Sequence, residues 1–392
     1  MKFQRRNALF YFILAGLGLT TAWYFNYKAI IDQENFFGAW FTSNADMVVA
    51  CDLLITATAA APYIIIEGRR LKMKNLWLYI ALSAVSAIAF VFPLFLGMRA
   101  LKLNKNHLAG GRLETHTIHK HRVDVWVPAD LNPETPVLVM HDGKNLFMPE
   151  HSTFGATWGL LDALRPDARG YRRIRGERTP MIVGVWQIDD STRINELGPQ
   201  ALVDAHPEIL DMLPEAMKPA SRVMLSDAYQ ALLAEEILPF LAERHSLKLD
   251  KSRTAIAGSS MGGLASLYGL AKYPEVYGTA LAYSTHWPFG MKLAVEGLAK
   301  LLPNASAGNR IWTDCGTIEL DALYPPMHNK FVELMRAKGY TRDEDFIGAI
   351  YPNTGHSETW WAGRVEHPIN WWLNPNEPKS NLTDREWVGL PQ

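Results

Sequence analysis

Hydrophobic residues are distributed unevenly along the 392-residue chain. Three long apolar stretches occupy residues 8–27, 48–66 and 76–98. Each is long enough for a helix to cross the roughly 30 Å hydrocarbon layer of a bilayer. The pattern therefore predicts an all-α domain of three transmembrane helices over residues 1–102.

Two features of this region invite a different interpretation. The first stretch follows Lys2, Arg5 and Arg6, as the apolar core of a cleaved signal peptide does. The two further apolar stretches favour a retained membrane helix. Asp52 lies about one helical turn inside the second stretch, where it can reach headgroups or water, so a role in transport is not expected.

Basic residues predict the orientation in the membrane. Lysine and arginine cluster before the first stretch and between the second and third, whereas residues 28–46 hold one lysine and three acidic residues. The positive-inside rule then puts the N-terminus in the cytoplasm. Three crossings would leave the rest of the chain on the periplasmic or extracellular side of a bacterial inner membrane. Arg99, Lys102 and Lys105 argue mildly for the opposite side.

Beyond residue 112 the pattern changes to short apolar runs that alternate with amphipathic segments. We expect a linker at 103–112, a folded domain at 113–373 and an extended tail at 374–392. Alternation along the chain predicts an antiparallel edge first and then buried strands separated by helices. This order is typical of a doubly wound, mostly parallel α/β sheet. The expected strands are 113–118, 122–127, 136–140, 180–185, 254–258, 279–284, 310–314 and 346–351.

Composition removes several function classes. The 39 basic and 40 acidic residues nearly balance, so nucleic acid is not an expected partner. Cys51 and Cys315 lie in different parts of the chain, and no structural disulfide is expected. His116, His119 and His121 alternate along one strand without cysteines or a suitably placed carboxylate, so no metal site is predicted.

The segment 254–263 reads T-A-I-A-G-S-S-M-G-G and carries the first chemical signal. Ser260 lies between Gly258 and Gly262, after a predicted strand and before a predicted helix. This is the G-x-S-x-G nucleophile elbow of α/β-hydrolases. The strained backbone of such a serine requires small neighbours, and the N–H of Met261 faces the place where an oxyanion would form.

A serine nucleophile needs a base and an acid, which in this fold follow in the order Ser, acid, His. His356 lies in a glycine-containing loop directly after the last predicted strand. The acid is expected after strand 310–314, where Glu319 and Asp321 both lie. Asp321 is favoured, and the choice stays open. Asp314, at the strand end, is expected to hold the loop.

The loop after strand 136–140 reads H-D-G-K-N. Its Gly143 permits a tight turn, and the amide of Lys144 is the expected second oxyanion donor. Asp142 and Asn145 either cap this loop or contact the substrate. The other expected substrate contacts, each with packing as the alternative, are His286, Trp287 and Trp360.

Six motifs occur in an order that resembles an esterase family of α/β-hydrolases, which includes esterase D, enterochelin esterases and mycolyltransferases. The resemblance covers about residues 113–373 and implies ester hydrolysis by Ser260, Asp321 and His356. The chain departs from the family pattern in the segment after His356, where Trp360 and Trp361 are both present. The first hundred residues resemble an uncharacterised family of bacterial three-helix membrane domains. The motifs are VLVMHDGKNLF (137–147), IVGVWQIDDSTRINE (182–196), GSSMGGLASLYGLAKYPEVYG (258–278), STHWP (284–288), DCGTIELDALY (314–324) and GHSETWW (355–361).

The leading hypothesis is a membrane-anchored serine esterase that needs no cofactor and whose partners are an ester substrate and the bilayer. An acyltransferase that passes the acyl group to a sugar hydroxyl is the first alternative, because only the acceptor differs. A catalytically silent, membrane-anchored binding domain is the second. The intact serine, acid and histidine positions count against it.

Overall fold

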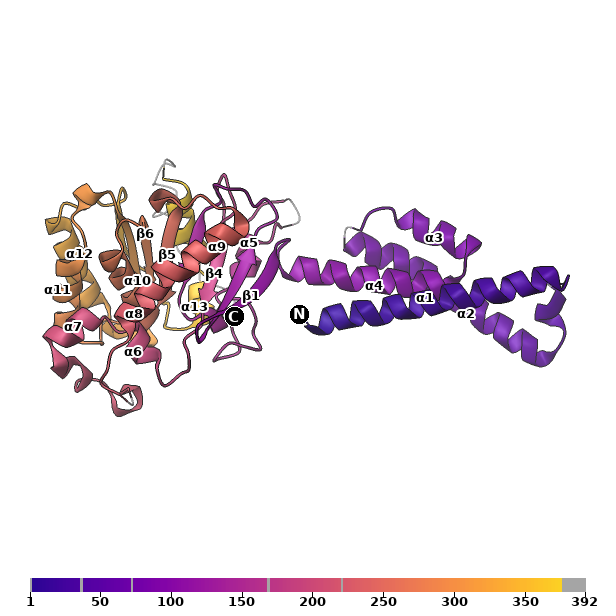
Figure 1. Cartoon of the computed structure of the whole chain (residues 1–392), viewed down its shortest axis with the longest axis horizontal. Helices are drawn as coiled ribbons and strands as arrows, with labels where there is room; N and C mark the ends of the chain where they lie inside the picture. Colours follow the sequence, from indigo (N-terminus) through magenta and orange to yellow (C-terminus); the bar gives the residue numbers. More distant parts are fainter. Residues whose placement is uncertain (1, 36–37, 72, 168–169, 220, 376–392) are drawn as a thin grey trace. The chain divides into compact units, whose positions relative to one another are not determined.

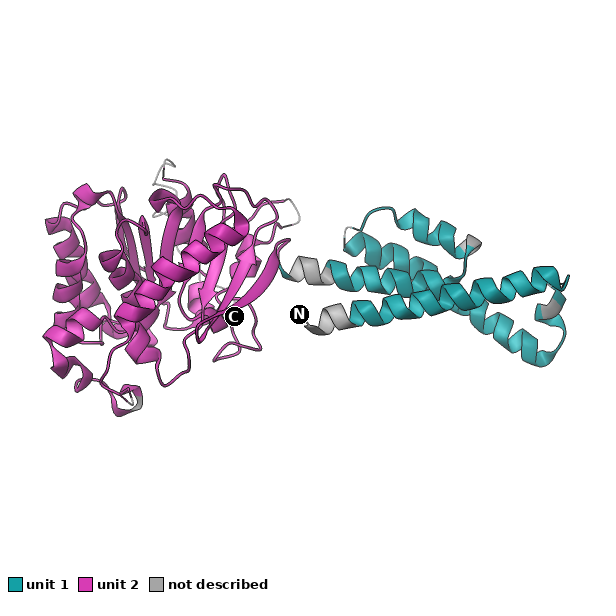
Figure 2. Cartoon of the chain, viewed as in Figure 1, with its two compact units in different colours: residues 1–108 teal, residues 109–392 magenta. Residues whose placement is uncertain are grey.

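The computed structural model describes residues 2–375 except 36–37, 72, 168–169 and 220. Two compact units divide the chain, residues 1–108 and 109–392 (Figure 2). The first unit is helical and the second is built around one sheet (Figure 1). Most of the expected tail, from residue 376 onward, lies outside the described residues.

Two helices of the first unit have the length and composition to cross a membrane. They are residues Asn7–Ile31 of α1 (Lys2–Ile31) and all of α2 (Asn44–Arg70). Only 11% and 17% of their most apolar windows is buried, whereas a helix in the core of a soluble protein is mostly buried. Their exposed apolar surface suggests association with lipid.

The prediction of a third uninterrupted transmembrane helix at 76–98 is wrong. The segment forms α3 (Leu76–Val85) and α4 (Ile88–His107), which continues into the segment expected to be a linker. Ser86 is the residue at which α3 ends, and its hydroxyl donates to the carbonyl of Leu82 at 2.7 Å. Such a bond to the carbonyl four residues earlier often bends a helix.

The two helices fold back on each other as a hairpin. Tyr79 on α3 meets Phe95 on α4 with ring centroids 5.5 Å apart. Along α1, Ala89 lies beside Gly18, and Gly97 lies beside Phe12. The chain of α4 therefore runs antiparallel to α1 and ends near the end at which α1 begins. At that same end of the unit, Arg99 Nε donates to Glu67 of α2 at 2.7 Å.

Close packing of α1 on α4 depends on Gly18. A Cβ atom there would lie 2.2 Å from the carbonyl oxygen of Ala89, whereas a Cβ atom at Gly16 would meet nothing within 4 Å. We predict that Gly18→Val lowers the free energy of unfolding by about 1–3 kcal/mol and that Gly16→Val has a much smaller effect. Thermal unfolding of the purified protein in detergent measures both. Equal melting temperatures for the two variants would contradict this packing.

The second unit contains a mostly parallel sheet of eight strands in the order β1-β2-β4-β3-β5-β6-β7-β8. β1–β2 and β2–β4 pair antiparallel and every other pair is parallel. The prediction of an α/β-hydrolase fold after an all-α segment is confirmed. The strands are β1 (Arg112–Ile118), β2 (His121–Val127), β3 (Val137–Met140), β4 (Met181–Val185), β5 (Thr254–Ser259), β6 (Thr279–Tyr283), β7 (Arg310–Cys315) and β8 (Phe346–Ile350).

Helices cover both faces of this sheet, so the central strands are buried on two sides. Every residue of β3, β4, β5 and β6 is buried, whereas the edge strand β1 is partly exposed along its length. Parallel neighbours end at one edge of the sheet, where the loops after β3, β5, β6 and β7 meet. The described helices of this unit are α5 (Leu160–Leu164), α6 (Arg193–Leu197), α7 (Gln200–Ala205), α8 (Ser226–Ala231), the π-helical η5 (Leu232–Ile237), α9 (Leu238–His245), α10 (Met261–Lys272), α11 (Lys292–Leu301), α12 (Pro325–Ala337), α13 (Glu358–Ala362) and α14 (Glu366–Leu373), with short 3-10 turns between them.

Candidate active site

Ser260 sits on a strained turn between β5 and α10. Its backbone has φ +56° and ψ −122°, a conformation that side-chain-bearing residues rarely adopt. A Cβ atom at Gly258 would lie 2.6 Å from the carbonyl oxygen of Gly262, so the turn needs glycine there. Met261 is the first residue of α10, and its N–H therefore has no acceptor within the helix.

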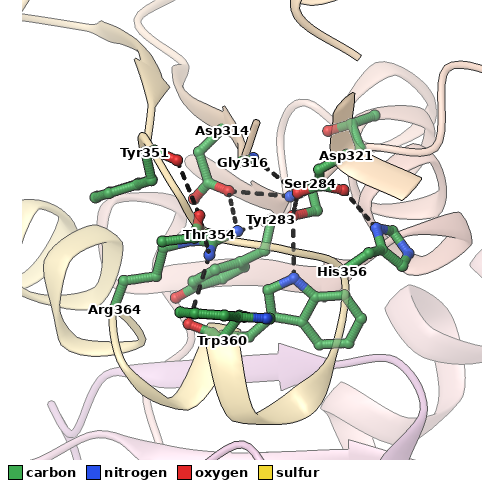
Figure 3. Close-up of polar contacts among 12 residues, drawn as sticks. Tyr283, Ser284, Asp314, Gly316, Asp321, Tyr351, Thr354, His356, Trp360 and Arg364 are labelled. Atoms are coloured by element: carbon green, nitrogen blue, oxygen red, sulfur yellow. Dashed lines mark hydrogen bonds and ion pairs between the residues drawn. The ribbon is translucent and has the colours of Figure 1, made fainter. Parts of the chain in front are cut away.

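His356 and Asp321 come together from two loops at the same edge of the sheet (Figure 3). His356 Nδ1 lies 2.6 Å from Asp321 Oδ1, and the aspartate is fully buried. Burial alone would raise the pKa of Asp321, but the hydrogen bond from His356 and those from Ser284 and Gly316 hold it below its usual value. Asp321 is therefore the carboxylate that touches the imidazole.

His286 connects this pair to the elbow. Its N–H donates to the carbonyl of Ser260 at 3.1 Å, and its ring centroid lies 6.3 Å from that of His356. Among the described contacts no hydrogen bond joins Ser260 Oγ to His356. Such bonds are often long until a substrate is bound.

Glu319 holds the histidine loop by its backbone. Its Oε2 accepts the N–H of His356 at 3.0 Å, and its Oε1 accepts the indole N–H of Trp360 at 3.4 Å. A Cβ atom at Gly355 would lie 2.2 Å from Glu319 Oε2, which explains the glycine next to His356. The two candidate carboxylates thus contact different parts of the same residue.

The loop after β3 is fixed by a partly buried ion pair. Arg193 donates to both carboxylate oxygens of Asp142 at 2.7 Å, and burial alone would raise the pKa of Asp142, but Arg193 holds it below its usual value. Asn145 Nδ2 donates to Glu358 at 3.0 Å, while its Oδ1 accepts the N–H of Thr153 at 3.1 Å. These contacts favour a loop-holding role over substrate contact for Asp142 and Asn145.

Lys144 comes directly after Gly143, where the backbone of this loop lies close to the backbone of β4. A Cβ atom at Gly143 would lie 2.5 Å from the carbonyl carbon of Gly184, so glycine is needed there. The N–H of His141 donates to the carbonyl of Ala257 at 3.0 Å, which ties this loop to the strand of the elbow. The amides of Lys144 and Met261 therefore belong to neighbouring loops. The side chain of Lys144 pairs with Asp190.

The expected aromatic contacts differ in exposure. Trp287 is fully buried and stacks on Phe331 at 4.9 Å, so the prediction that it contacts substrate is wrong. It fills the core between the sheet and α12. His286 Nδ1 bonds Tyr324 Oη at 2.6 Å, and burial lowers the pKa of His286 to about 3. Trp360 is partly exposed, and its substrate role stays a prediction.

Two polar residues near the site gave no sequence signal as functional residues. Ser284, directly after β6, donates its hydroxyl to Asp321 Oδ2 at 2.6 Å. Arg364 is fully buried, donates to Ser284 Oγ at 2.7 Å and pairs with Asp314 at 3.0 Å (Figure 3). Asp314 also accepts the N–H of Ser284 at 3.0 Å, which agrees with its expected loop-holding role. These partners are too far apart in sequence for any local pattern to pair them.

The expectation that three histidines alternate along one strand is wrong, because His116 lies on β1, His119 in the turn after it and His121 on β2. Each of them contacts a glutamate. The nitrogen–oxygen distances are 3.3, 2.6 and 3.2 Å for His116, His119 and His121. Within the described part of the chain, no group of three or more histidine, cysteine or acidic side chains could hold a metal ion.

The different contacts of the two carboxylates predict different consequences of removing their charge. Asp321→Asn should lower kcat by about 10⁴-fold, because an amide no longer stabilises the imidazolium or selects the correct tautomer. Glu319→Gln keeps an oxygen for the His356 N–H and should lower kcat less than tenfold, on the order of one neutral hydrogen bond. Steady-state hydrolysis of a soluble aryl ester compares them. The opposite ranking would transfer the acid role to Glu319.

Two known families match this chain, one within each of its two compact units. Residues 10–101 match a family described as a protein of unknown function, DUF2834. Residues 207–365 match a family described as "Putative esterase". This second match begins after β4 and contains the elbow, Asp321 and His356.

Curated relatives match less than half of the chain. An Iron(III) enterobactin esterase of Dickeya dadantii is 24% identical over 171 residues, which are 40% of this chain and 38% of that protein. An Iron(III) salmochelin esterase of Escherichia coli O6:H1 is 25% identical over 199 residues, 45% of this chain and 47% of the relative. The matched region thus spans less than half of each of these two proteins.

Solved structures of enzymes with similar names align with part of this chain at low sequence identity. The enterobactin esterase of Shigella flexneri has a TM-score of 0.48 at 17% identity, covering 68% of this chain and 59% of its own. A ferulic acid esterase has a TM-score of 0.45 at 14% identity, covering 68% and 98%.

Proposed function

We propose that the second unit of this chain is a serine esterase of the α/β-hydrolase class, which cleaves carboxylic esters through an acyl-enzyme. The observation that carries the proposal is the 2.6 Å contact of His356 Nδ1 with the buried Asp321, beside the strained elbow of Ser260. A buried ionised carboxylate on a histidine is costly unless its charge is used or compensated. Here it would compensate the imidazolium that forms during the reaction.

Each step follows from this arrangement. Ser260 Oγ attacks the ester carbonyl while His356 Nε2 takes its proton. Asp321 accepts a hydrogen bond from His356 Nδ1–H and, as an anion, stabilises the imidazolium. The amides of Met261 and Lys144 would donate to the carbonyl oxygen as it becomes negative. His356 then protonates the leaving alcohol, and a water molecule, activated by the same nitrogen, releases the acid from Ser260.

Removing the nucleophile tests this proposal most directly. Ser260→Ala should lower turnover of a soluble aryl ester by about 10⁴-fold or more and abolish labelling by a fluorophosphonate. Ser252→Ala, at an exposed serine in the turn before β5, is the matched control and should behave as wild type. Undiminished turnover by Ser260→Ala would refute the mechanism. A wild-type protein that takes no label would instead favour a silent binding domain.

We also propose that the first unit anchors the enzyme through two crossings, α1 and α2. The expectation of a periplasmic catalytic domain depended on a third crossing. The hairpin of α3 and α4 instead returns to the end of the unit at which α1 begins, and an even number of crossings leaves both ends of the chain on one side.

Charge supports this assignment. The basic residues in the first two turns of α1, around the end of α2 and in the second half of α4 then all lie on the side of the N-terminus. The positive-inside rule makes that side the cytoplasm. Arg99, Lys102 and Lys105, which opposed the three-crossing topology, agree with this one. The catalytic unit would therefore meet esters on the cytoplasmic face of the membrane.

Single cysteines probe the orientation in a background with Cys51 and Cys315 replaced by serine. Ser43→Cys lies in the exposed turn before α2, and Ser252→Cys lies on the surface of the second unit. A membrane-impermeant maleimide should label Ser43→Cys in intact cells and Ser252→Cys only after permeabilisation. Labelling of both in intact cells would restore the periplasmic assignment.

A further inference from the structure

We infer that Ser284 and Arg364 are positioning residues, which hold Asp321 ionised and oriented so that His356 keeps its proton on Nδ1 and leaves Nε2 free as the base. The inference rests on the proposed ester hydrolysis and extends it. Neither residue touches the reacting atoms. Both act through Asp321.

The direction of every hydrogen bond at Ser284 can be worked out by counting protons. Its Oγ has three polar neighbours: Trp361 Nε1 at 3.0 Å, Arg364 Nη2 at 2.7 Å and Asp321 Oδ2 at 2.6 Å. An indole and a guanidinium can only donate, and a hydroxyl has two lone pairs and one hydrogen. Both lone pairs are therefore used, and the hydrogen must point to Asp321.

The same count restricts where Asp321 could carry a proton and favours its ionised form. Its Oδ2 receives the Ser284 hydroxyl and the N–H of Gly316 at 2.7 Å. A proton on Oδ2 would face two donors in a site with no solvent exposure, and such an unmatched contact is costly. Oδ1 is left for His356 alone.

The tautomer of His356 follows. An ionised Oδ1 accepts, so Nδ1 must carry the hydrogen and Nε2 presents a lone pair. If Asp321 were protonated, Oδ1 would donate to Nδ1 and the imidazole proton would sit on Nε2. That form cannot accept the proton of Ser260. The two donors at Oδ2, Ser284 and Gly316, stabilise the ionised carboxylate and so disfavour this inactive tautomer.

Arg364 occupies one lone pair of Ser284 Oγ and so directs the hydroxyl hydrogen of Ser284 toward Asp321. Its charge is balanced by Asp314, whose Oδ1 accepts from Arg364 Nη2 and from the N–H of Ser284, each at 3.0 Å. Ser284 has φ +40°, so its backbone is held in a strained turn by this contact. Figure 3 shows Arg364 reaching from the segment after α13 to the ends of β6 and β7.

Titratable groups near Asp321 and His356 could contribute to the pH profile of the enzyme if they ionise in the neutral range. Burial raises the pKa of Tyr324 and Cys315 and lowers that of His286, which removes all three from the neutral range. Burial also raises the pKa of Glu358, so this carboxyl needs a control. The titratable groups that interact with Asp321 or His356 are His286, Cys315, Glu319, Tyr324, His328, Glu358 and Arg364.

The test compares Ser284→Ala, Arg364→Lys and the double variant with wild type in the full-length protein. Ser226→Ala is the matched control, because Ser226 is also a buried serine whose oxygen accepts a hydrogen bond, from the N–H of Gln200 at 2.9 Å. Fluorophosphonate titration counts active sites, so that kcat is expressed per folded site. The pH profile of kcat/KM is recorded for each variant and repeated in a Glu358→Gln background.

Ser284→Ala should lower kcat per active site by about 10- to 100-fold, the effect of one hydrogen bond to a charged group, with KM changed less than threefold. Its acid limb should move to higher pH, because a carboxylate with one donor fewer holds the imidazolium more tightly. Arg364→Lys keeps a charged donor and should have a smaller effect. It should add nothing in the double variant, since Arg364 acts through Ser284.

A wild-type acid limb and kcat in Ser284→Ala would overturn the inference and leave the esterase intact. So would a loss confined to the number of titratable sites, since that marks a folding role only. Additive effects in the double variant would exclude action of Arg364 through Ser284. A wild-type protein without Ser260-dependent turnover would overturn the proposed function itself, and the inference with it.

Discussion

The fully buried guanidinium of Arg364 is the constraint around which the catalytic half of the second unit is arranged. A lone buried charge is very costly, so the fold must supply a counter-charge and acceptors for its protons. Asp314 at the end of β7 supplies the charge, and Ser284 after β6 supplies an acceptor. Ser284 in turn donates to Asp321 and orients it. The geometry of the acid therefore depends on the Arg364–Asp314 ion pair, which contacts neither Ser260 nor His356.

A second ion pair holds the loop after β3. Arg193 donates two hydrogen bonds to Asp142 of this loop, and Asn145 links the same loop to Glu358 on α13. The loop of the expected oxyanion donor and the loop of His356 are thereby joined through side chains. Polar groups around the site are therefore used mainly to hold loops, and few are left to contact a substrate.

The first unit follows different physical rules, because its exposed surface is apolar. Small residues let α1 and α4 approach closely, as at Gly18, and Glu67 pairs with Arg70 and Arg99 at one end of the unit. Small contacts and paired charges are what helices in lipid require, since lipid gives no hydrophobic drive for helix association. The break at Ser86 changes the proposed topology, because two crossings in place of three would leave the N-terminus and the second unit on the same side of a membrane.

Sequence patterns determined the features that depend on neighbouring residues. Alternation and apolar runs located the strands, and the spacing of Gly258, Ser260 and Gly262 located the elbow, because a strained turn admits few residue types. The tertiary structure alone decided which partners meet. It separated Asp321 from Glu319, buried Trp287, paired Arg364 with Ser284 and divided the third apolar stretch. Each of these depends on contacts between residues brought together by folding, and local spacing carries no information about them.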